Sequence, residues 1–170
     1  MKPDDYLELA LELLQNTKPG RPKQVRFRRA VSNAYYAMFH AVCIVCSDAL
    51  VGASSNRPER AWLQLYRSFQ HNTARDKCQN LPKTFPDPLH AFAAGFIVLH
   101  GLRAHADYDP SLRLSLSESE KIVERARADI ARLEELDARD RKAFAVWTLH
   151  SQRGSTLAAY EKWSEGHEAS

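Results

Sequence analysis

The sequence predicts a single all-α domain, an antiparallel bundle of four to five helices. Apolar residues recur at helical spacing through most of the chain. Only 6 of the 170 residues are glycine, which argues against a turn-rich all-β design. A content of 44% hydrophobic and 26% charged residues is ordinary for a globular protein with a buried core. We expect residues 1–150 to form the bundle and residues 151–170 to form a polar C-terminal tail.

The first two predicted helices are the clearest. The first covers 4–15, where Asp4 or Asp5 can cap the start and the segment 16–20 (NTKPG) ends it. The second runs from about residue 22 to about residue 50 with a broad apolar face. At about 1.5 Å per residue it would span roughly 40 Å, so we expect it to be the central helix.

Three more helices follow. The third is predicted over 59–77, after a loop and with Pro58 at a typical first-turn position. The fourth is predicted over 88–106, after a connection that contains three prolines. The fifth is predicted over 117–136, because Ser117 and Glu120 match a capping box, and residues 137–150 could extend it.

No membrane span and no metal site are predicted. No apolar run approaches the about 18 residues that a spanning helix needs, and acidic residues occupy the N-terminal stretch MKPDDYLELA, so we expect a cytoplasmic protein. His40, Cys43 and Cys46 lie three residues apart, but steps of three drift around a helix and no fourth ligand is evident. The cysteines are therefore interpreted as small hydrophobic residues, and no cofactor is expected.

Positive charge is concentrated in one stretch of the chain. The net charge is only +3, but the stretch from Lys18 to Arg29 contains no acidic residue. This run is equally consistent with an exposed helix start and with a surface that attracts an anionic polymer. Its six basic residues are Lys18, Arg21, Lys23, Arg26, Arg28 and Arg29.

A polar stripe lies along the predicted central helix. Its members recur at i,i+4 spacing and so share one face of an otherwise apolar helix, where buried polar groups need hydrogen-bond partners. The simplest partners lie at the end of the fourth helix. The stripe is either a structural network that fixes helix register or part of a phosphate-binding cleft. It consists of Arg28, Ser32, Tyr36 and His40, and the expected partners are Arg103, Asp107 and Tyr108.

Arg103 and His105, at the end of the fourth helix, have side chains suited to RNA cleavage. Attack by a ribose 2′-hydroxyl needs a proton acceptor, a proton donor and positive charge on the phosphate. Histidine has a pKa of about 6.5, and arginine offers a planar fork to phosphate. In the structural alternative, Arg103 pairs with Asp107, His105 offsets the helix dipole and Tyr108 is a packing residue.

Two segments resemble the HEPN superfamily, in particular its small stand-alone bacterial proteins. They are RAVSNAYYAMFHA at 29–41 and LRAHADYDP at 102–110, in the expected order. The resemblance covers residues 4–136. It implies an antiparallel helical bundle, often dimeric, that acts as a metal-independent ribonuclease, as an RNA binder, or as the partner of a small nucleotidyltransferase. Active ribonucleases of the family carry an arginine followed after four to six residues by a histidine. Here His105 lies only two residues after Arg103, and no other histidine follows until His150.

Two main functions follow from the resemblance. In the first, the chain is an endoribonuclease toxin of a toxin–antitoxin system, with Arg103 and His105 as catalytic residues. In the second, it is a non-catalytic module that binds RNA or a nucleotidyltransferase-type antitoxin. In both, supporting or phosphate-binding roles would fall to Arg28, Arg29, Ser32, Tyr36, His40, Asp107 and Tyr108.

Three further expectations complete the sequence-based predictions. A weaker third function is a small-molecule sensor that uses a pocket between the second and fourth helices. A symmetric homodimer is expected from the family and from apolar residues on the fourth helix, namely Phe92, Phe96, Ile97 and Leu99. The isolated histidines His71, His90 and His150 are interpreted as ordinary surface or core residues.

Overall fold

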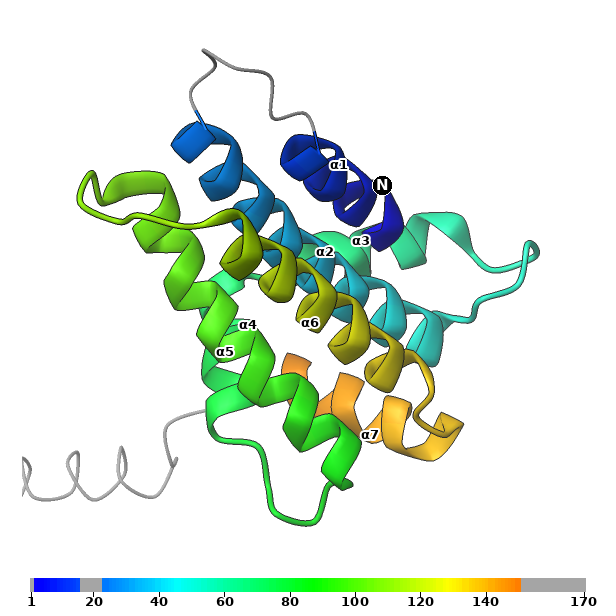
Figure 1. Ribbon diagram of the computed structural model, residues 1–170. Coiled ribbons are helices and arrows are strands. Elements are labelled where there is room, and N and C mark those ends of the chain that lie inside the picture. The colour runs from blue at the N-terminus through cyan, green and yellow to red at the C-terminus, as the bar shows by residue number, and fades with distance from the viewer. Residues whose placement is uncertain (1, 16–22, 151–170) are drawn as a thin grey trace, which may run out of the picture.

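All the regular secondary structure in the described part of the chain is helical. A computed structural model describes residues 2–15 and 23–150, and within these ranges there are seven helices and no strand (Figure 1). The predicted all-α class is therefore confirmed for these residues. The tail at 151–170 and the basic residues Lys18 and Arg21 lie outside the described ranges. The helices are α1 (Pro3–Gln15), α2 (Lys23–Val51), α3 (Glu59–Ser68), α4 (His71–Gln79), α5 (Asp87–Tyr108), α6 (Leu116–Glu134) and α7 (Ala138–Leu149).

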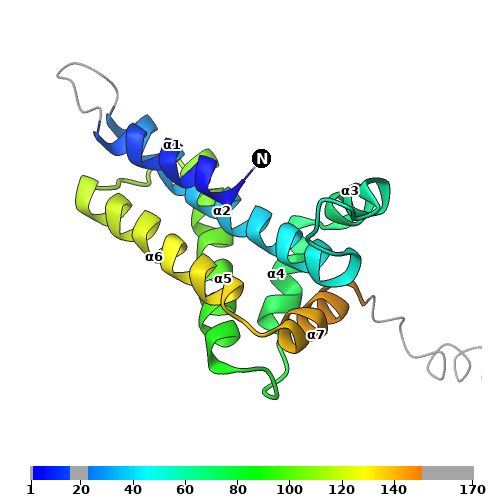
Figure 2. The same cartoon turned by 90° about the vertical axis from the view of Figure 1, so that its right-hand side faces the viewer.

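Helix α2 is the centre of the fold, as its length predicted. It packs against α1, α3, α5, α6 and α7, and the two views in Figures 1 and 2 show it running through the middle of the bundle. Its neighbours α5 and α6 run in opposite directions. Because helices surround α2 on several sides, its buried residues do not form a single narrow stripe. Tyr35, Met38 and Val42 are completely buried.

Helix α2 is also long and apolar enough to cross a membrane by length and composition alone. However, 61% of its apolar window is buried inside the bundle. That burial is typical of the core helix of a soluble protein, and the fold is compatible with one.

The predicted third helix, 59–77, is in fact two helices. Helix α3 ends at Ser68 and α4 begins at His71, while Phe69 and Gln70 adopt extended backbone angles (φ −71°, ψ 132° and φ −118°, ψ 139°). The Phe69 ring is buried in the core. The break lets α3 pack on α2 while α4 turns to pack on α5 and α7, which one straight helix could not do.

The C-terminal region also differs from the prediction. The capping residue of helix α6 lies two residues before the predicted one, because the capping box uses Ser115 and Glu118 in place of Ser117 and Glu120. Residues 137–150 do not extend it; Asp137 accepts a hydrogen bond from the Asp140 amide and caps the separate helix α7. With the break at Phe69, this raises the number of helices above the expected four to five.

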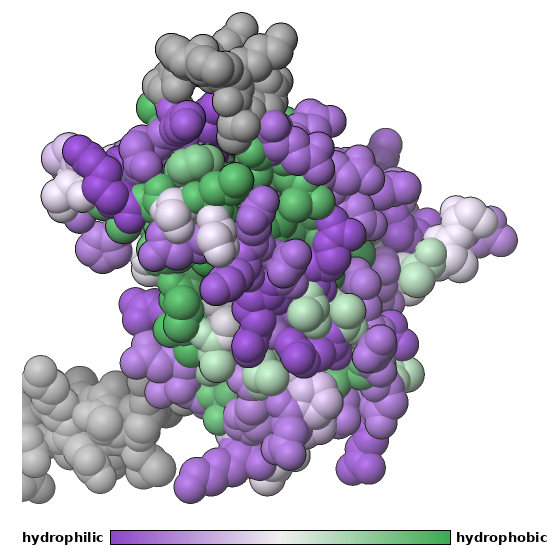
Figure 3. Space-filling view, in the orientation of Figure 1, coloured by the Kyte–Doolittle hydropathy of each residue, from purple (hydrophilic) through white to green (hydrophobic). Residues whose placement is uncertain are grey.

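The apolar side chains that suggested a homodimer are largely inside the protomer. Phe92 and Phe96 are completely buried, Leu99 is 5% exposed, and Ile97 is only partly accessible. These side chains are therefore no basis for a dimer, and the dimer itself stays a prediction that rests on the family resemblance. On the face that carries α5 and α6, Figure 3 shows hydrophobic surface within a largely hydrophilic exterior. A groove between these helices includes Ala94, Gly95, Val98, Leu102 and Ile122.

Candidate functional site

A polar network joins the middle of α2 to the end of α5. Ser32 Oγ donates a hydrogen bond of 2.7 Å to Asp107 Oδ1, and Arg103 Nη2 donates one of 2.9 Å to the Tyr36 hydroxyl. Arg103 Nε lies 3.2 Å from Asp107 Oδ2. Both charged groups are largely shielded, with 23% of the Arg103 side chain and 15% of the Asp107 side chain exposed. The structure thus brings Ser32 and Tyr36 of the stripe on α2 to two of the partners expected on the fourth predicted helix, Arg103 and Asp107.

Two basic residues at the start of α2 flank this network. Arg28 donates to the backbone oxygens of Leu112 (2.6 Å) and Ala106 (3.4 Å), so it ties the end of α5 to α2. Arg29 is 64% exposed, and its Nη1 lies 3.8 Å from Asp107 Oδ1. Arg28 therefore has a structural role, whereas Arg29 adds positive charge at the surface beside Asp107. We call Arg28, Ser32, Tyr36, Arg103 and Asp107 the α2–α5 network.

The other three predicted site residues lie outside this network. At about 100° per residue, two residues along a helix differ by roughly 200° in direction, so His105 does not share the face of Arg103. Its side chain is 67% exposed and its Nδ1 lies 3.6 Å from Asp109 Oδ2. Tyr108 is 79% exposed. The structure does not bring the expected pair of Arg103 and His105 together.

His40, the last member of the stripe, belongs to a stack of aromatic rings. It stacks on Tyr6 at 4.9 Å and on Tyr66 at 5.8 Å between ring centroids, and its Nδ1 is hydrogen-bonded to the Tyr66 hydroxyl. The stack continues from Tyr66 to Trp62, which packs at 5.1 Å. These contacts join α1 and α3 to α2, so His40 serves packing between helices.

Two histidines that the sequence analysis left aside lie beside Arg103. The rings of His71, the first residue of α4, and His100, on α5, each lie 5.6 Å from the ring of Tyr35. Arg103 Cζ lies 5.8 Å from the same ring and 5.4 Å from that of Tyr36. Tyr35 is therefore a common neighbour of two imidazoles and one guanidinium. We call His71 and His100 the histidine pair.

Hydrogen bonds hold each member of the pair. The Tyr35 hydroxyl and His71 Nδ1 are 2.7 Å apart, and His100 Nε2 lies 3.2 Å from Asn72 Oδ1. His100 precedes Arg103 by three residues on one helix face, a spacing visible in the sequence. The position of His71 could not be predicted, because it depends on the break at Phe69.

Burial and positive charge both favour the neutral imidazoles. Burial lowers the pKa of His71, and Arg103 and His100 lower it further. Burial likewise lowers the pKa of His100, with contributions from Arg75 and Arg103 that Asp76 partly opposes. Burial raises the pKa of Tyr35, so its hydroxyl remains protonated. A neutral imidazole next to a guanidinium can accept a proton from a bound ligand.

The cysteines do not suggest a metal centre. Within residues 2–15 and 23–150, no group of three or more His, Cys, Asp or Glu side chains is arranged to hold a metal ion. Cys43, Cys46 and Cys78 are buried free thiols, and burial raises the pKa of Cys43 and of Cys78 to about 12. The thiols therefore stay protonated and pack as small apolar groups.

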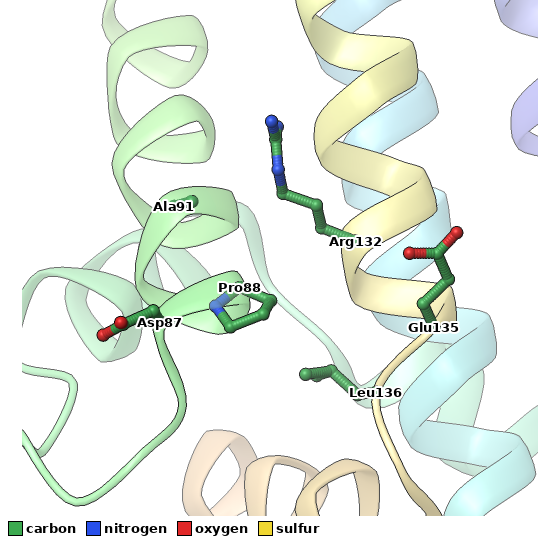
Figure 4. A pocket seen from close by; sticks show the side chains of 6 residues that line it. All are labelled: Asp87, Pro88, Ala91, Arg132, Glu135 and Leu136. Carbon is green, nitrogen blue, oxygen red and sulfur yellow. The ribbon is translucent and has the colours of Figure 1, made fainter.

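Two hollows of the surface, both between α5 and α6, do not include the histidine pair. Figure 4 shows one between the start of α5 and the end of α6, where Pro88 and Leu136 lie toward the gap and the Asp87 carboxylate points away from it. Arg132 is already bonded to Asp129. Neither this hollow nor the groove between α5 and α6 includes Arg103, His71 or His100. The side chains of His71 and His100 are partly accessible.

Comparisons of the chain with protein-family models, with curated proteins and with solved structures find no match.

Proposed function

We propose that this chain is an RNA-binding helical-bundle protein that holds an RNA phosphate at Arg103. The observation that carries the proposal is the way the guanidinium is held. The Tyr36 hydroxyl accepts from Nη2 on one side and Asp107 lies against Nε on the other, so the fork is fixed before any ligand arrives. Within the described part of the chain, Nη1 of Arg103 donates no hydrogen bond.

A fixed arginine is well suited to a phosphate ester. Its planar donors match phosphate oxygens, and an already ordered side chain loses little conformational entropy on binding. Arg29 lies nearby at the surface and, with Lys23 at the start of α2, extends the positive charge along the bundle. Such charge attracts a polyanion and makes its binding dependent on salt.

The resemblance to HEPN proteins makes RNA the expected polyanion, and it includes the toxin–antitoxin setting and a nucleotidyltransferase partner. Because His105 lies away from Arg103, the geometry supports RNA binding better than it supports catalysis by that pair. RNA binding is common to both functions expected from the sequence.

Fluorescence anisotropy with a labelled single-stranded oligoribonucleotide tests the proposal. Arg103→Ala should weaken binding and reduce the slope of log affinity against log salt by about 0.7, the effect of one lost contact with a single strand. Arg139→Ala is the matched control, because this arginine is exposed in the first turn of α7, and α7 lies away from the C-terminal end of α5 in Figure 1. Parental affinity and parental slope in a folded Arg103→Ala variant would contradict the proposal.

A further inference from the structure

We infer that the groove between α5 and α6 binds a small amphiphile, a ligand with an apolar chain and a single carboxylate. The apolar chain lies along the groove, and the carboxylate pairs with Arg125 at its rim. The groove is separate from the α2–α5 network, because none of the residues that line it belongs to that network. The inference is therefore independent of RNA binding and of the proposed function.

Small residues on α5 leave room for the groove. Helices α5 and α6 pack against each other and run in opposite directions (Figure 1). Ala94 and Gly95 fill little space on the α5 side, and Gly95 approaches α6 so closely that an added Cβ would overlap Asp129. The groove that these residues help to line has a volume of about 370 Å³, which lies in the range of small-molecule sites.

The walls of the groove are mostly apolar. Val98 on α5 is 65% exposed, and Leu102 and Ile122, which also line the groove, are partly exposed. An apolar chain that covers these side chains releases the water over them, and this release favours binding. The uncovered apolar surface amounts to a few side chains, whereas a protein partner of standard size covers about 800 Å² on each side. The groove therefore fits a small molecule better than a partner helix.

Arg125 at the rim of the groove is held in place by Asp129. The Asp129 carboxylate is completely buried and accepts from Arg125 Nε at 3.0 and 2.9 Å. Within the described part of the chain, the two Nη nitrogens of Arg125 donate no hydrogen bond, and the side chain is 59% exposed. These nitrogens form the end of the planar fork, where each can donate to one oxygen of a carboxylate.

The charges that line the groove favour an anion. Two positive side chains, Lys121 and Arg125, stand one turn apart on α6 against the single carboxylate of Asp129. Glu118 lies near Lys121 and offsets part of its charge, so Arg125 is the main group that selects the ligand. Arg132 also donates to Asp129, which leaves the charge of Arg125 less fully balanced. A carboxylate at Arg125 supplies the missing negative charge.

Titration calorimetry of the full-length protein with octanoate tests the inference. The comparison probe is 1-octanol, which has as many carbons but no charge. The parent should bind octanoate about tenfold more tightly than octanol, the effect of a charge-assisted hydrogen bond. Arg125→Gln should remove this preference and leave the affinity for octanol unchanged, because only a carboxylate pairs with the guanidinium. Arg132 keeps Asp129 paired in this variant, so the fold should persist, and a thermal melt checks it.

Val98→Asp tests the location of the site. It places a negative charge in the apolar wall, so the affinity for octanoate should fall by about tenfold or more. Val146→Asp is the matched control, because Val146 is a 55% exposed valine on α7, outside the groove, and this variant should bind octanoate like the parent. Both valines are exposed, so both variants should fold.

Three results of the titrations would overturn the inference. They are a parent that does not bind octanoate at millimolar concentration, a parent that binds octanol as tightly as octanoate, and a folded Val98→Asp variant with parental affinity. A dimeric mass of the parent by light scattering that Val98→Asp reduces to a monomeric mass would also overturn it, because a second copy of the chain would then occupy the groove.

Discussion

The carboxylate of Asp129 on α6 lies against the backbone of Gly95 on α5, and it leaves no room for a side chain at residue 95. Asp129 is completely buried. It accepts hydrogen bonds of 3.0 and 2.9 Å from Arg125 Nε and another from Arg132 Nη1. The close approach of α5 and α6 therefore depends on a glycine facing a paired, buried charge.

Substitution of Gly95 tests this contact. A Cβ at this position would overlap Asp129 Oδ2, so Gly95→Ala should destabilise the fold by about 1–3 kcal/mol, as overpacking does. In Gly101→Ala, the matched control on the same helix, the added Cβ meets nothing, and the variant should be more stable by up to about 1 kcal/mol. Urea unfolding of the two variants gives the comparison. Equal effects at both positions would show that Asp129 does not restrict Gly95.

A double-mutant cycle tests the same contact from the other side. Asp129→Ala removes the atoms that overlap the new Cβ, so Gly95→Ala should cost less in that background than in the parent. The two substitutions should therefore be non-additive in urea unfolding. Additive losses of stability would mean that Gly95→Ala acts on another part of the interface.

Tyr36→Phe should show how much of RNA binding depends on the orientation of the Arg103 guanidinium and how much depends on its positive charge. The variant loses the hydroxyl that accepts from Arg103 Nη2 but keeps the ring and every positive charge. We expect weaker RNA binding with an unchanged salt slope, together with a loss of stability of about 0.5–1.5 kcal/mol. Anisotropy titrations at several salt concentrations and a thermal melt provide both values. A salt slope that falls as in Arg103→Ala would contradict a purely positioning role.

His105→Ala tests the catalytic pair expected from the sequence. Because His105 is 67% exposed and lies near Asp109 rather than Arg103, the variant should keep the RNA affinity of the parent and any cleavage activity that the parent has. The measurements are the anisotropy titration and the incubation of both proteins with a labelled oligoribonucleotide in EDTA. A large loss of cleavage with normal binding would return the catalytic role to His105.

Stability should decrease as the pH falls through the range in which histidine titrates. Burial lowers the pKa values of His40, His71 and His100 in the folded state, so the unfolded chain binds more protons near pH 6. Their contribution is fully present above the unfolded pKa of about 6.5 and is lost as the pH falls through the folded values. The melting temperature should therefore be lower at pH 5.5 than at pH 7.5.

Burial sets the direction of this effect, and the charged groups that face the histidine pair add to it or oppose it. Arg103 and Tyr35 face His71, while Arg75, Asp76 and Arg103 surround His100. In a variant carrying both His71→Gln and His100→Gln, the difference in melting temperature between the two pH values should be smaller than in the parent. If the double variant and the parent show the same difference in melting temperature, His71 and His100 are not the cause of the pH dependence of stability.

Most helices of this fold could be predicted from local sequence. The apolar spacing placed α1, α2 and α5 within about two residues of their ends. The break at Phe69 was missed because neither glycine nor proline marks it; the chain turns there as the Phe69 ring enters the core. The start of α6 was misplaced because Ser115 and Ser117 both match the capping pattern two residues apart, and local sequence does not choose between them.

The sequence by itself determined the α2 half of the candidate site, because i,i+4 spacing specifies which side chains share a helix face whatever surrounds the helix. It also indicated Arg103 and Asp107 as partners of Ser32 and Tyr36. Only the tertiary structure decided which histidines lie beside Arg103. His71 is distant from it in the chain, and it reaches Tyr35 only because α4 turns at Phe69 and packs against α5. The spacing of residues along a helix specifies which side chains share a face of that helix, whereas the packing of the core decides which helix faces contact one another.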